Sequence, residues 1–274
     1  MNPAPFPQAR PLSACPDADL ARLRGLFTDI DDTLTTDGRL TAEAYGALEA
    51  LRDAGLWVIP ITGRPAGWCD HIARMWPVDA VVGENGAFYF HYDRAARKLR
   101  RRFLQDDAER AEGRRRLAAL RERILADIPG TGVASDQAYR EADLAIDFCE
   151  DVPALPPDQV DRIVAAFAAA GAMAKVSSIH VNGWFGAYDK LTMTRILMDE
   201  VFGIDLDAEK DRFTFAGDSP NDAPMFAFFP LAVGVANLRD FADRLEAWPA
   251  YVTEGRAGHG FAQLARRVIA ARGA

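Results

Sequence analysis

The sequence has little cysteine, no long apolar run and no excess of positive charge. Three cysteines in 274 residues are too few for a disulfide framework, and their odd number indicates reduced thiols and a cytoplasmic protein. No apolar run reaches the roughly 18 residues that a membrane span requires, so we expect no membrane partner. The net charge of −8 at pH 7 argues against a general nucleic-acid-binding protein.

The length and the composition of the chain are typical of a folded protein with one large or two ordinary domains. Hydrophobic residues make up 49% of the chain and charged residues 26%, which excludes a disordered polypeptide. Residues 1–24 are an exception, because they are rich in proline and lack a continuous apolar segment. We therefore predict a flexible N-terminal arm there and no signal peptide.

Positive charge is concentrated in residues 93–123, which hold 12 Lys and Arg against 6 Asp and Glu. Such a stretch could contact an anion or another chain. The interpretation that we favour is a solvent-exposed helix face on which arginines pair with neighbouring acids. The sequence leaves any further role of this stretch open.

Short apolar runs alternate with amphipathic segments in the part of the chain that follows the arm. The runs span 23–30, 56–62 and 79–82, and the segments between them predict helices over 42–54 and 65–76. Thr41 is suited to cap the first of these helices and Gly55 to end it. Continuous apolar strands that alternate with helices are typical of a parallel α/β sheet.

This alternation stops after residue 87. The next hundred residues predict helices over 106–127 and 157–170 and strands over 144–148 and 175–181. Asn182–Gly183 is a favoured turn pair, so we expect a hairpin turn there. This mixture is typical of an α+β domain.

The α/β alternation resumes near residue 188, with helices expected over 191–202 and 261–271 and strands over 212–216 and 231–235. The predicted fold class is therefore α/β, with a Rossmann-like parallel-sheet core and an inserted domain. The core is formed by residues 25–87 and 188–274, and residues 88–187 form the inserted α+β domain.

Three acids follow the first strand, in the run Asp29-Ile30-Asp31-Asp32-Thr33. In open α/β sheets ligands bind at this carboxyl edge. Asp29 and Asp31 are two residues apart, so their side chains share a side of an extended segment. One of them could bind a hard metal ion and attack a substrate while the other handles protons. A surface turn remains an equally good interpretation of this run taken alone.

Asp218, Asn221 and Asp222 follow a second apolar strand and offer the oxygen ligands that Mg²⁺ prefers. A helix N-cap at Asp218 or Ser219, before Pro220, explains the same residues without a metal.

Two further positions suit the binding of a phosphate group. Thr62-Gly63-Arg64 ends another strand, where a hydroxyl and backbone N–H groups suit a phosphate oxygen. Lys190 begins a helix, where the helix dipole does not favour a cation, which suggests a point charge near anions. Taken alone, an ordinary turn and a surface lysine are the better interpretations.

The four elements together, in this order and each at the end of its strand or helix, resemble the haloacid dehalogenase-like hydrolases. The resemblance covers nearly the whole chain from Gly25. It is greatest to the large-cap IIB branch, and within it to the mannosyl-3-phosphoglycerate and sucrose-phosphate phosphatases. It implies a Mg²⁺-dependent phosphatase that hydrolyses a phosphate monoester of a sugar or related small metabolite through an aspartyl-phosphate.

The resemblance also implies roles for individual residues. Asp29 matches the nucleophile, and Asp31 matches the general acid and base. The metal ligands would be Asp29, Asp218 and the backbone carbonyl of Asp31. Thr62 and Lys190 match the residues that bind the transferring phosphoryl group. Two further residues match supporting positions near the metal and the lysine, namely Asn221 and Asp222.

The inserted domain resembles the mobile cap of this family. The loop 83–87 resembles the point where the chain leaves the core, and the polar, aromatic stretch 177–186 resembles a sugar-binding wall. The residues that would contact the substrate are Gly63, Arg64, Glu84, Asn85, His180 and Asn182.

Other functions remain possible on the same fold. A phosphomutase-type phosphotransferase would return the phosphoryl group from the aspartate to its substrate. A non-catalytic binding module is disfavoured because Asp29, Asp31, Lys190 and Asp218 are all present. The partner that we expect is a small phosphorylated metabolite, and the oligomeric state is left open.

Overall fold

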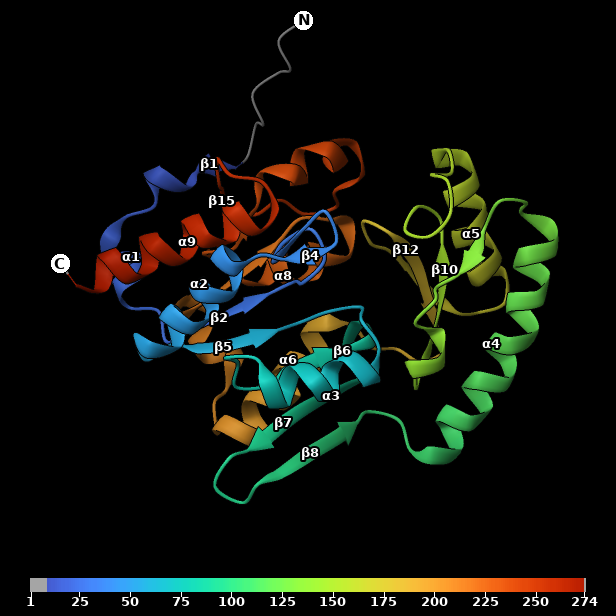
Figure 1. Ribbon diagram of the computed structural model, residues 1–274, viewed down its shortest axis with the longest axis horizontal. Helices are drawn as coiled ribbons and strands as arrows, with labels where there is room; N and C mark the ends of the chain where they lie inside the picture. The colour runs from blue at the N-terminus through green and yellow to red at the C-terminus, as the bar shows by residue number, and fades with distance from the viewer. Residues whose placement is uncertain (1–8, 274) are drawn as a thin grey trace, which may run out of the picture.

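The computed structural model describes residues 9–273, which form a larger domain and a smaller one beside it (Figure 1). The larger domain is built on a six-stranded sheet in the order β1-β15-β14-β13-β2-β5. Every pairing in this sheet is parallel. The predicted α/β fold class with a parallel-sheet core is therefore confirmed.

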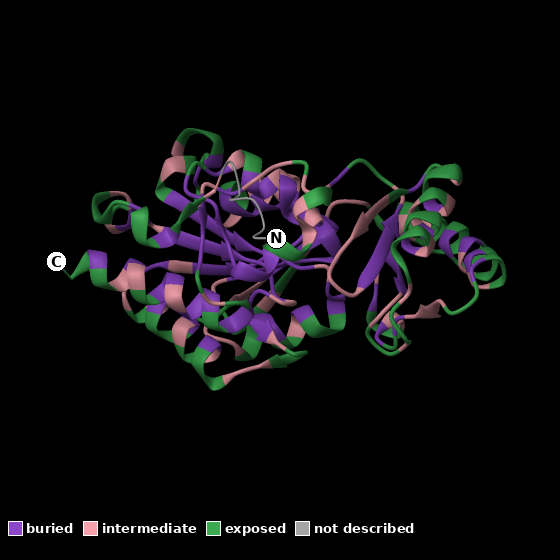
Figure 2. Ribbon diagram, turned by 90° about the horizontal axis from the view of Figure 1, so that it is seen from above, coloured by how far each residue is buried: buried purple, intermediate pink, exposed green. Residues whose placement is uncertain are grey.

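The strands of the six-stranded sheet are short and, apart from the exposed edge strand β1, almost entirely buried (Figure 2). They are β1 Arg10–Pro11, β2 Gly25–Thr28, β5 Trp57–Pro60, β13 Phe213–Gly217, β14 Val233–Gly234 and β15 Tyr251–Val252. Alternate residues serve two separate apolar clusters. Leu26 and Val58 pack in one cluster, and Phe27 and Ile59 pack in the other. This two-sided burial explains why the strands read as continuous apolar runs.

Helices cover both faces of this sheet. One cluster packs under α1 Asp17–Ala21, α2 Ala42–Asp53, α3 Ala66–Met75 and α9 Ala257–Arg272. The other packs under α6 Lys190–Phe202, α7 Leu206–Glu209 and α8 Ala223–Phe228. The Thr41 hydroxyl accepts a hydrogen bond from the Ala44 N–H at 3.3 Å, so the predicted cap of α2 is confirmed.

The boundary of the inserted domain differs from the prediction. An isolated parallel bridge between Ile61 and Val82 joins β6 Val81–Gly83 to the core sheet. The strands β7 Phe88–Asp93 and β8 Lys98–Phe103 continue from β6 as an antiparallel meander. Phe88 and Phe90 belong to the apolar core of the larger domain. Residues 88–103 therefore lie with the core, and the predicted boundary at residue 88 is too early.

The smaller domain, which we call the cap, has its own apolar cluster, drawn from residues 117–185. Its antiparallel sheet has the order β11-β12-β10-β9. The elements are α4 Asp107–Asp127, β9 Gly132–Val133, η3 Gln137–Tyr139, β10 Asp143–Asp147, α5 Pro157–Ala169, β11 Met173–Val176 and β12 His180–Trp184. Helices α4 and α5 lie on the side of this sheet that faces away from the core (Figure 1).

The hairpin turn predicted at Asn182–Gly183 is wrong. Both residues lie inside β12, which pairs with β10 and β11, and the turn lies at residues 177–179. A side chain at position 183 would overlap the ring of Phe167, because a Cβ atom there would lie 2.0 Å from the ring. Glycine therefore stands at this position to let α5 pack closely on the sheet, and not to form a turn.

The flexible arm predicted for residues 1–24 does not hold for residues 10–24. Strand β1 pairs with β15 at the edge of the core sheet. Leu12, Leu20 and Leu23 are buried in the apolar core. The buried leucines thus anchor residues 10–24 to the core, although the prolines of this segment had suggested a flexible arm. The first eight residues of the predicted arm lie outside the described residues.

The arginine-rich stretch 93–123 is exposed on β8 and α4, where ion pairs join Arg110 to Asp107 and Arg114 to Glu141. The interpretation as a solvent-exposed face with paired charges is confirmed. Among the described residues, no helix has the length and apolar character that crossing a membrane would require.

Candidate active site

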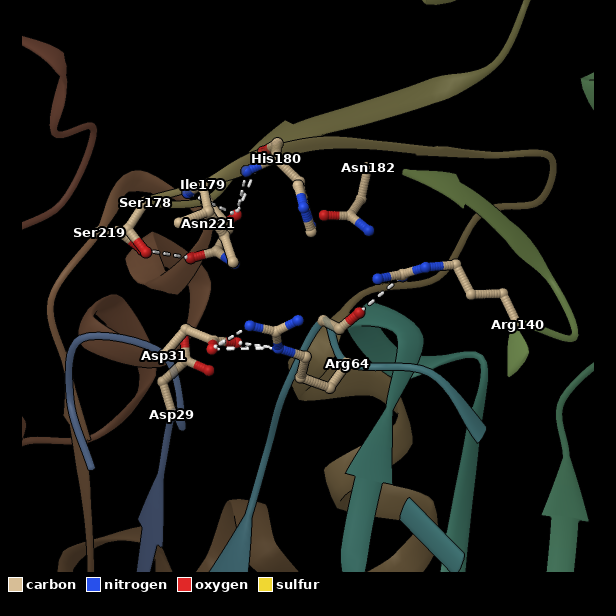
Figure 3. Close-up of a pocket in the computed structure, with 12 residues that line it drawn as sticks. Asp29, Asp31, Arg64, Arg140, Ser178, Ile179, His180, Asn182, Ser219 and Asn221 are labelled. Atoms are coloured by element: carbon tan, nitrogen blue, oxygen red, sulfur yellow. Dashed lines mark hydrogen bonds and ion pairs between the residues drawn. The ribbon is translucent and has the colours of Figure 1, made fainter. Parts of the chain in front are cut away.

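The carboxyl ends of three neighbouring core strands bring the predicted residues together. Asp29 follows β2, Thr62 follows β5 and Asp218 follows β13. Because β2 lies between β5 and β13 in the sheet, these residues meet at one edge. Figure 3 shows Asp29 and Asp31 at this edge, facing a strand of the cap.

Lys190 is the cation at the centre of the site. Its Nζ donates to Asp29 Oδ2 and to Asp222 Oδ1, both at 2.7 Å, and all three side chains are buried. Burial alone would lower the pKa of the lysine, but the carboxylates of Asp222 and Asp29 outweigh it and raise the pKa. Burial raises the pKa of Asp29, and the Lys190 ammonium opposes that rise. The lysine is thus held charged beside the predicted nucleophile.

Asp29, Asp218 and Asp222 form a buried group whose carboxylate oxygens lie within 4.8 Å of one another, close enough to hold a metal ion. Burial and the neighbouring carboxylates of Asp222 and Asp29 raise the pKa of Asp218 well above its ordinary value. A cation among these groups would relieve that repulsion, and hard oxygen ligands suit Mg²⁺. The residues present therefore fit the predicted metal.

Asp29 and Asp218 are better placed as metal ligands than Asp222. Asp222 already accepts hydrogen bonds from Lys190 through Oδ1 and from the backbone N–H groups of Asp218 and Ser219 through Oδ2. This arrangement requires Gly217, because a Cβ atom there would lie 2.3 Å from Asp222 Oδ2. Asp222 therefore holds the loop and the lysine in place, as its predicted supporting role requires.

The loop that carries Asp218 is also a helix N-cap, which was the alternative interpretation of its sequence. Ser219 and Asp222 form a capping box on the short helix η5 Pro220–Asp222. The Ser219 hydroxyl donates to Asn221 Oδ1 at 2.8 Å, which orients the second predicted supporting residue toward the site. The same loop therefore forms the N-cap of η5 and contributes to the acidic group.

Asp31 is held by Arg64, which follows β5. Arg64 Nε lies 3.1 Å from Asp31 Oδ1 and 3.0 Å from Oδ2, and Nη2 lies 2.9 Å from Oδ1. The guanidinium also lies over the ring of Trp68, 4.4 Å from its centroid. Arg64 therefore fixes the orientation of the predicted acid and base.

Thr62 lies beneath this contact and is fully buried. Its hydroxyl accepts a hydrogen bond from the Arg64 N–H at 3.0 Å and keeps its own proton to donate. Gly63 lines the hollow above Asp29. A Cβ atom at Gly63 would lie 3.1 Å from Asn85 Nδ2, so the glycine leaves room beside that amide.

The cap contributes one face of its sheet to the site (Figure 3). Along β12, Val181 belongs to the apolar cluster of the cap, whereas His180 and Asn182 line the hollow above Asp29. This alternation is the two-residue period of a strand. The structure therefore brings both predicted cap residues to the site, although it does so from a strand and not from a loop.

Glu84 and Asn85 differ from each other in what they contact. The Glu84 carboxylate accepts hydrogen bonds from the N–H groups of Ala66, Glu141, Ala142 and Asp143, so the residue joins core to cap away from the hollow. Glu84 is therefore not among the residues that line the hollow. The buried amide of Asn85 has no hydrogen-bond partner within residues 9–273, which leaves it available to a ligand.

Several residues of the site carried no signal in the sequence. Arg140 of the cap lines the hollow and donates to the Gly63 carbonyl at 2.9 Å. Asn237 donates to the Asp32 carbonyl at 2.8 Å and to Asp218 Oδ2 at 3.3 Å. Neither residue stands in a motif, and only the fold places them at the site.

Comparison with known proteins supports a family resemblance. Residues 26–110 match the family model described as haloacid dehalogenase-like hydrolase. This match supports the predicted enzyme class. A search of curated proteins finds no match to the chain.

Solved structures share the fold over most of the chain. A C-terminal domain of trehalose-6-phosphate phosphatase from C. albicans has a TM-score of 0.67 at 12% identity and covers 97% of this chain and 99% of its own. A protein of Thermoplasma acidophilum, 0175, has a TM-score of 0.65 at 20% identity, with 90% and 98% covered. The sucrose-phosphatase of Synechocystis, solved with sucrose and phosphate, has a TM-score of 0.62 at 16% identity, with 90% and 98% covered. The predicted resemblance to the haloacid dehalogenase-like hydrolases is thus confirmed in sequence over residues 26–110, and the solved structures share the fold of nearly the whole chain.

Proposed function

We propose that this protein is a phosphatase that hydrolyses the phosphate monoester of a sugar or related small metabolite. The observation that carries the proposal is the contact between Lys190 and Asp29, 2.7 Å apart and buried, beside Asp218 and below a cap. A carboxylate attacks a phosphate dianion poorly because both are negative. A buried ammonium at the attacking group offsets that repulsion.

In the first step a carboxylate oxygen of Asp29 attacks phosphorus, and the bond between phosphorus and the leaving oxygen breaks. Asp31, protonated at this stage, gives its proton to the leaving oxygen, so an alcohol departs. The phosphoryl group is then bound to Asp29 as an acyl phosphate. Thr62 and Lys190 are the donors that would hold its oxygens.

In the second step Asp31 is a carboxylate and accepts a proton from a water molecule. The water oxygen attacks phosphorus, the bond to the Asp29 oxygen breaks, and inorganic phosphate leaves. Arg64 serves both steps, because its guanidinium holds the Asp31 carboxyl group in one orientation. The enzyme returns to its starting state without any other reactant.

The carboxylates of Asp29 and Asp218, with the backbone carbonyl of Asp31, would hold Mg²⁺. When bound, the ion supplies positive charge that offsets the phosphate charge and the repulsion among the acids. The cap would close over the acyl phosphate and limit the access of bulk water. Structures with this fold include a sucrose-phosphatase and a trehalose-6-phosphate phosphatase, which supports a sugar phosphate as substrate.

The test is the substitution Asp29→Asn, which removes the nucleophile but keeps the side-chain shape. We expect phosphate release from p-nitrophenyl phosphate and from a panel of sugar phosphates to fall at least about 10³-fold. The control is Asp53→Asn, which makes the same change at an exposed position of α2. Excess EDTA should also abolish activity. Comparable turnover by a folded Asp29→Asn protein, or full activity in EDTA, would overturn the proposal.

A further inference from the structure

Two arginines line the hollow above the catalytic aspartates, Arg64 from the core and Arg140 from the cap (Figure 3). Such residues would ordinarily suggest a binding site for a carboxylate or a second phosphate on the substrate. Whether they can bind an anion depends on how many of their N–H groups are already engaged by protein acids.

Arg64 is engaged by three carboxylates. Besides Asp31, its Nη1 donates to Asp136 Oδ2 at 3.2 Å and its Nη2 to Glu150 Oε1 at 2.8 Å. Its side chain is only 7% exposed. Asp136 and Glu150 both belong to the cap, so they reach the guanidinium from the side on which a leaving group would lie.

Arg140 is engaged just as fully. Its Nε and Nη2 donate to Asp136 Oδ1 at 3.1 and 3.0 Å, and its Nη1 donates to Asp143 Oδ1 at 3.0 Å and to the Gly63 carbonyl. The Asp143 side chain is fully buried. His180, which also lines the hollow, lies 2.9 Å from Glu150 Oε2.

The charges of this wall therefore do not favour an anion. Three cap carboxylates, those of Asp136, Asp143 and Glu150, contact the two guanidinium groups, and Asp31 adds a fourth contact to Arg64. An anion placed here would displace a carboxylate from its arginine or lie against it unpaired. Either outcome costs free energy in a site that is largely shielded from water.

The groups left for a ligand are neutral. The buried amide atoms of Asn85, beside Gly63 of the hollow, lack hydrogen-bond partners within residues 9–273. The hydroxyl of Ser178 lines the hollow and donates to Asp32, which leaves its oxygen free to accept. Asn182 donates through Nδ2 to Asp143 at 2.9 Å, which leaves its carbonyl oxygen as an acceptor. Amides and a hydroxyl both donate and accept hydrogen bonds, as the hydroxyl groups of a sugar do.

We propose that the leaving group is an uncharged polyhydroxy compound, and that the cap carboxylates exclude substrates whose leaving group carries a carboxylate or a second phosphate. This inference rests on the proposed phosphatase function and narrows its substrate class. Asp136, Asp143 and Glu150 act as specificity-determining residues, because they occupy the arginines that would otherwise bind an anion. Recognition of the neutral group is left to Asn85, Ser178 and Asn182.

The test compares pairs of substrates of similar size in which only one member has a charged leaving group. Glucose 6-phosphate and 6-phosphogluconate are both phosphorylated at a primary hydroxyl and have similar size, but only the second carries a carboxylate. Glycerol 3-phosphate and 3-phosphoglycerate form a smaller pair of the same kind. We expect kcat/KM to be at least about 30-fold higher for the neutral member of each pair. Where turnover is slow, the members are compared as competitive inhibitors of p-nitrophenyl phosphate hydrolysis.

Variants test whether the carboxylates cause the discrimination. Glu150→Gln and Asp136→Asn each release arginine N–H groups. Each should lower the ratio of kcat/KM for the neutral member to kcat/KM for the anionic member by about tenfold. The control Glu122→Gln removes the same charge from an exposed position of α4 and should leave the ratio unchanged. A ratio is used because it does not depend on the absolute activity of a variant.

The outcomes separate this inference from the proposed function. Absence of phosphate release from every substrate, p-nitrophenyl phosphate included, would overturn the phosphatase function and this inference with it. Hydrolysis of p-nitrophenyl phosphate together with equal or better use of the anionic members would overturn the inference alone. Discrimination that survives unchanged in both Glu150→Gln and Asp136→Asn would also overturn it, since the cause would then lie elsewhere.

Discussion

The core and the cap build their parts of the site in different ways. In the core, parallel strands end at one edge, so Asp29 and Asp218 reach the site from strand termini. In the cap, an antiparallel sheet turns one face toward the site, so His180 and Asn182 reach it as alternate residues of β12. Strand ends give contiguous motifs, whereas a sheet face gives residues spaced through the chain.

The two parts also differ in how their charges are arranged. In the core one lysine lies between two carboxylates, and a third carboxylate completes a group suited to a cation. On the side of the cap, acids of the cap pair with both arginines of the hollow, Arg140 of the cap and Arg64 of the core. This difference matches the proposal that the core binds the charged phosphate group and that the cap contacts an uncharged leaving group.

The largest effect that we expect comes from Lys190→Met, which tests the core half of this comparison. The change removes the cation that neutralises Asp29 and Asp222, so nucleophile and phosphate would repel each other. We expect kcat/KM for p-nitrophenyl phosphate to fall by about 10³-fold or more. The control Lys98→Met removes an exposed lysine of β8 and should change kcat/KM less than twofold. A fall of less than tenfold in a folded Lys190→Met protein would contradict this role.

The joint between core and cap should give the next largest effect. The buried Glu84 carboxylate accepts hydrogen bonds from Ala66 at the start of α3 and from three successive N–H groups of the cap. Glu84→Gln keeps the shape but turns an N–H₂ group toward backbone donors. We expect the free energy of unfolding to fall by about 2 kcal/mol, measured with urea. Glu246→Gln, at an exposed position, is the control and should change it by less than about 0.5 kcal/mol.

The contrast between strand ends in the core and a sheet face in the cap also explains which parts of the fold and of the site the sequence could predict. The core residues Asp29, Asp31, Lys190 and Asp218 stand in short motifs at element ends, and the structure brings them together. Continuous apolar runs likewise predicted the parallel sheet, because strands buried on both faces carry few polar residues.

The cap was less predictable because its site depends on tertiary contacts. Arg140 and Glu150 reach the site through pairing partners distant in sequence, which no local pattern shows. Asn182–Gly183 has the composition of a turn, yet close packing against Phe167 explains the glycine. The boundary at residue 88 was misplaced because β7 and β8 form a separate antiparallel meander with β6, which packs against the core but resembles the start of an α+β domain in sequence.

A pH titration would sharpen the comparison at the contact between Glu150 of the cap and Arg64 of the core. Hydrogen bonding to His180, followed by that to Arg64, lowers the pKa of Glu150 from 4.5 to about 2. A carboxyl whose pKa is lower in the folded state stabilises the protein above its unfolded pKa. That contribution is lost as the pH falls from 4.5 toward 2.

We therefore expect the stability advantage of the natural protein over Glu150→Gln to shrink as the pH is lowered from 6 to 3.5. The total contribution should be about 1 to 2 kcal/mol after allowance for solvent screening of a partly exposed side chain. Urea unfolding at several pH values measures it. An advantage that stays constant over this range would show that the Glu150 pKa is not lowered by folding.

The smallest effects should come from the residues that cap helix N-termini. One such residue in each domain allows the two domains to be compared directly. Thr41 caps α2 of the core, and Asp106 forms a capping box with Glu109 at the start of α4 in the cap. Thr41→Ala and Asp106→Ala should each cost about 1 kcal/mol of stability. Neither residue lines the hollow, so activity should change less than twofold.

Amide hydrogen exchange should nevertheless separate these two variants. The buried residues of α2 begin at Ala44 in its first turn, whereas those of α4 begin only at Leu117, about halfway along the helix. Packing therefore keeps the first turn of α2 helical when the Thr41 side chain is removed, whereas the first turns of α4 depend on the capping box of Asp106 and Glu109. We expect exchange in residues 107–113 to rise at least about fivefold in Asp106→Ala and exchange at the start of α2 to rise less in Thr41→Ala. Asp106→Asn, which keeps a capping oxygen, should restore most of the protection, and equal fraying in both alanine variants would show that packing does not distinguish the two helix ends.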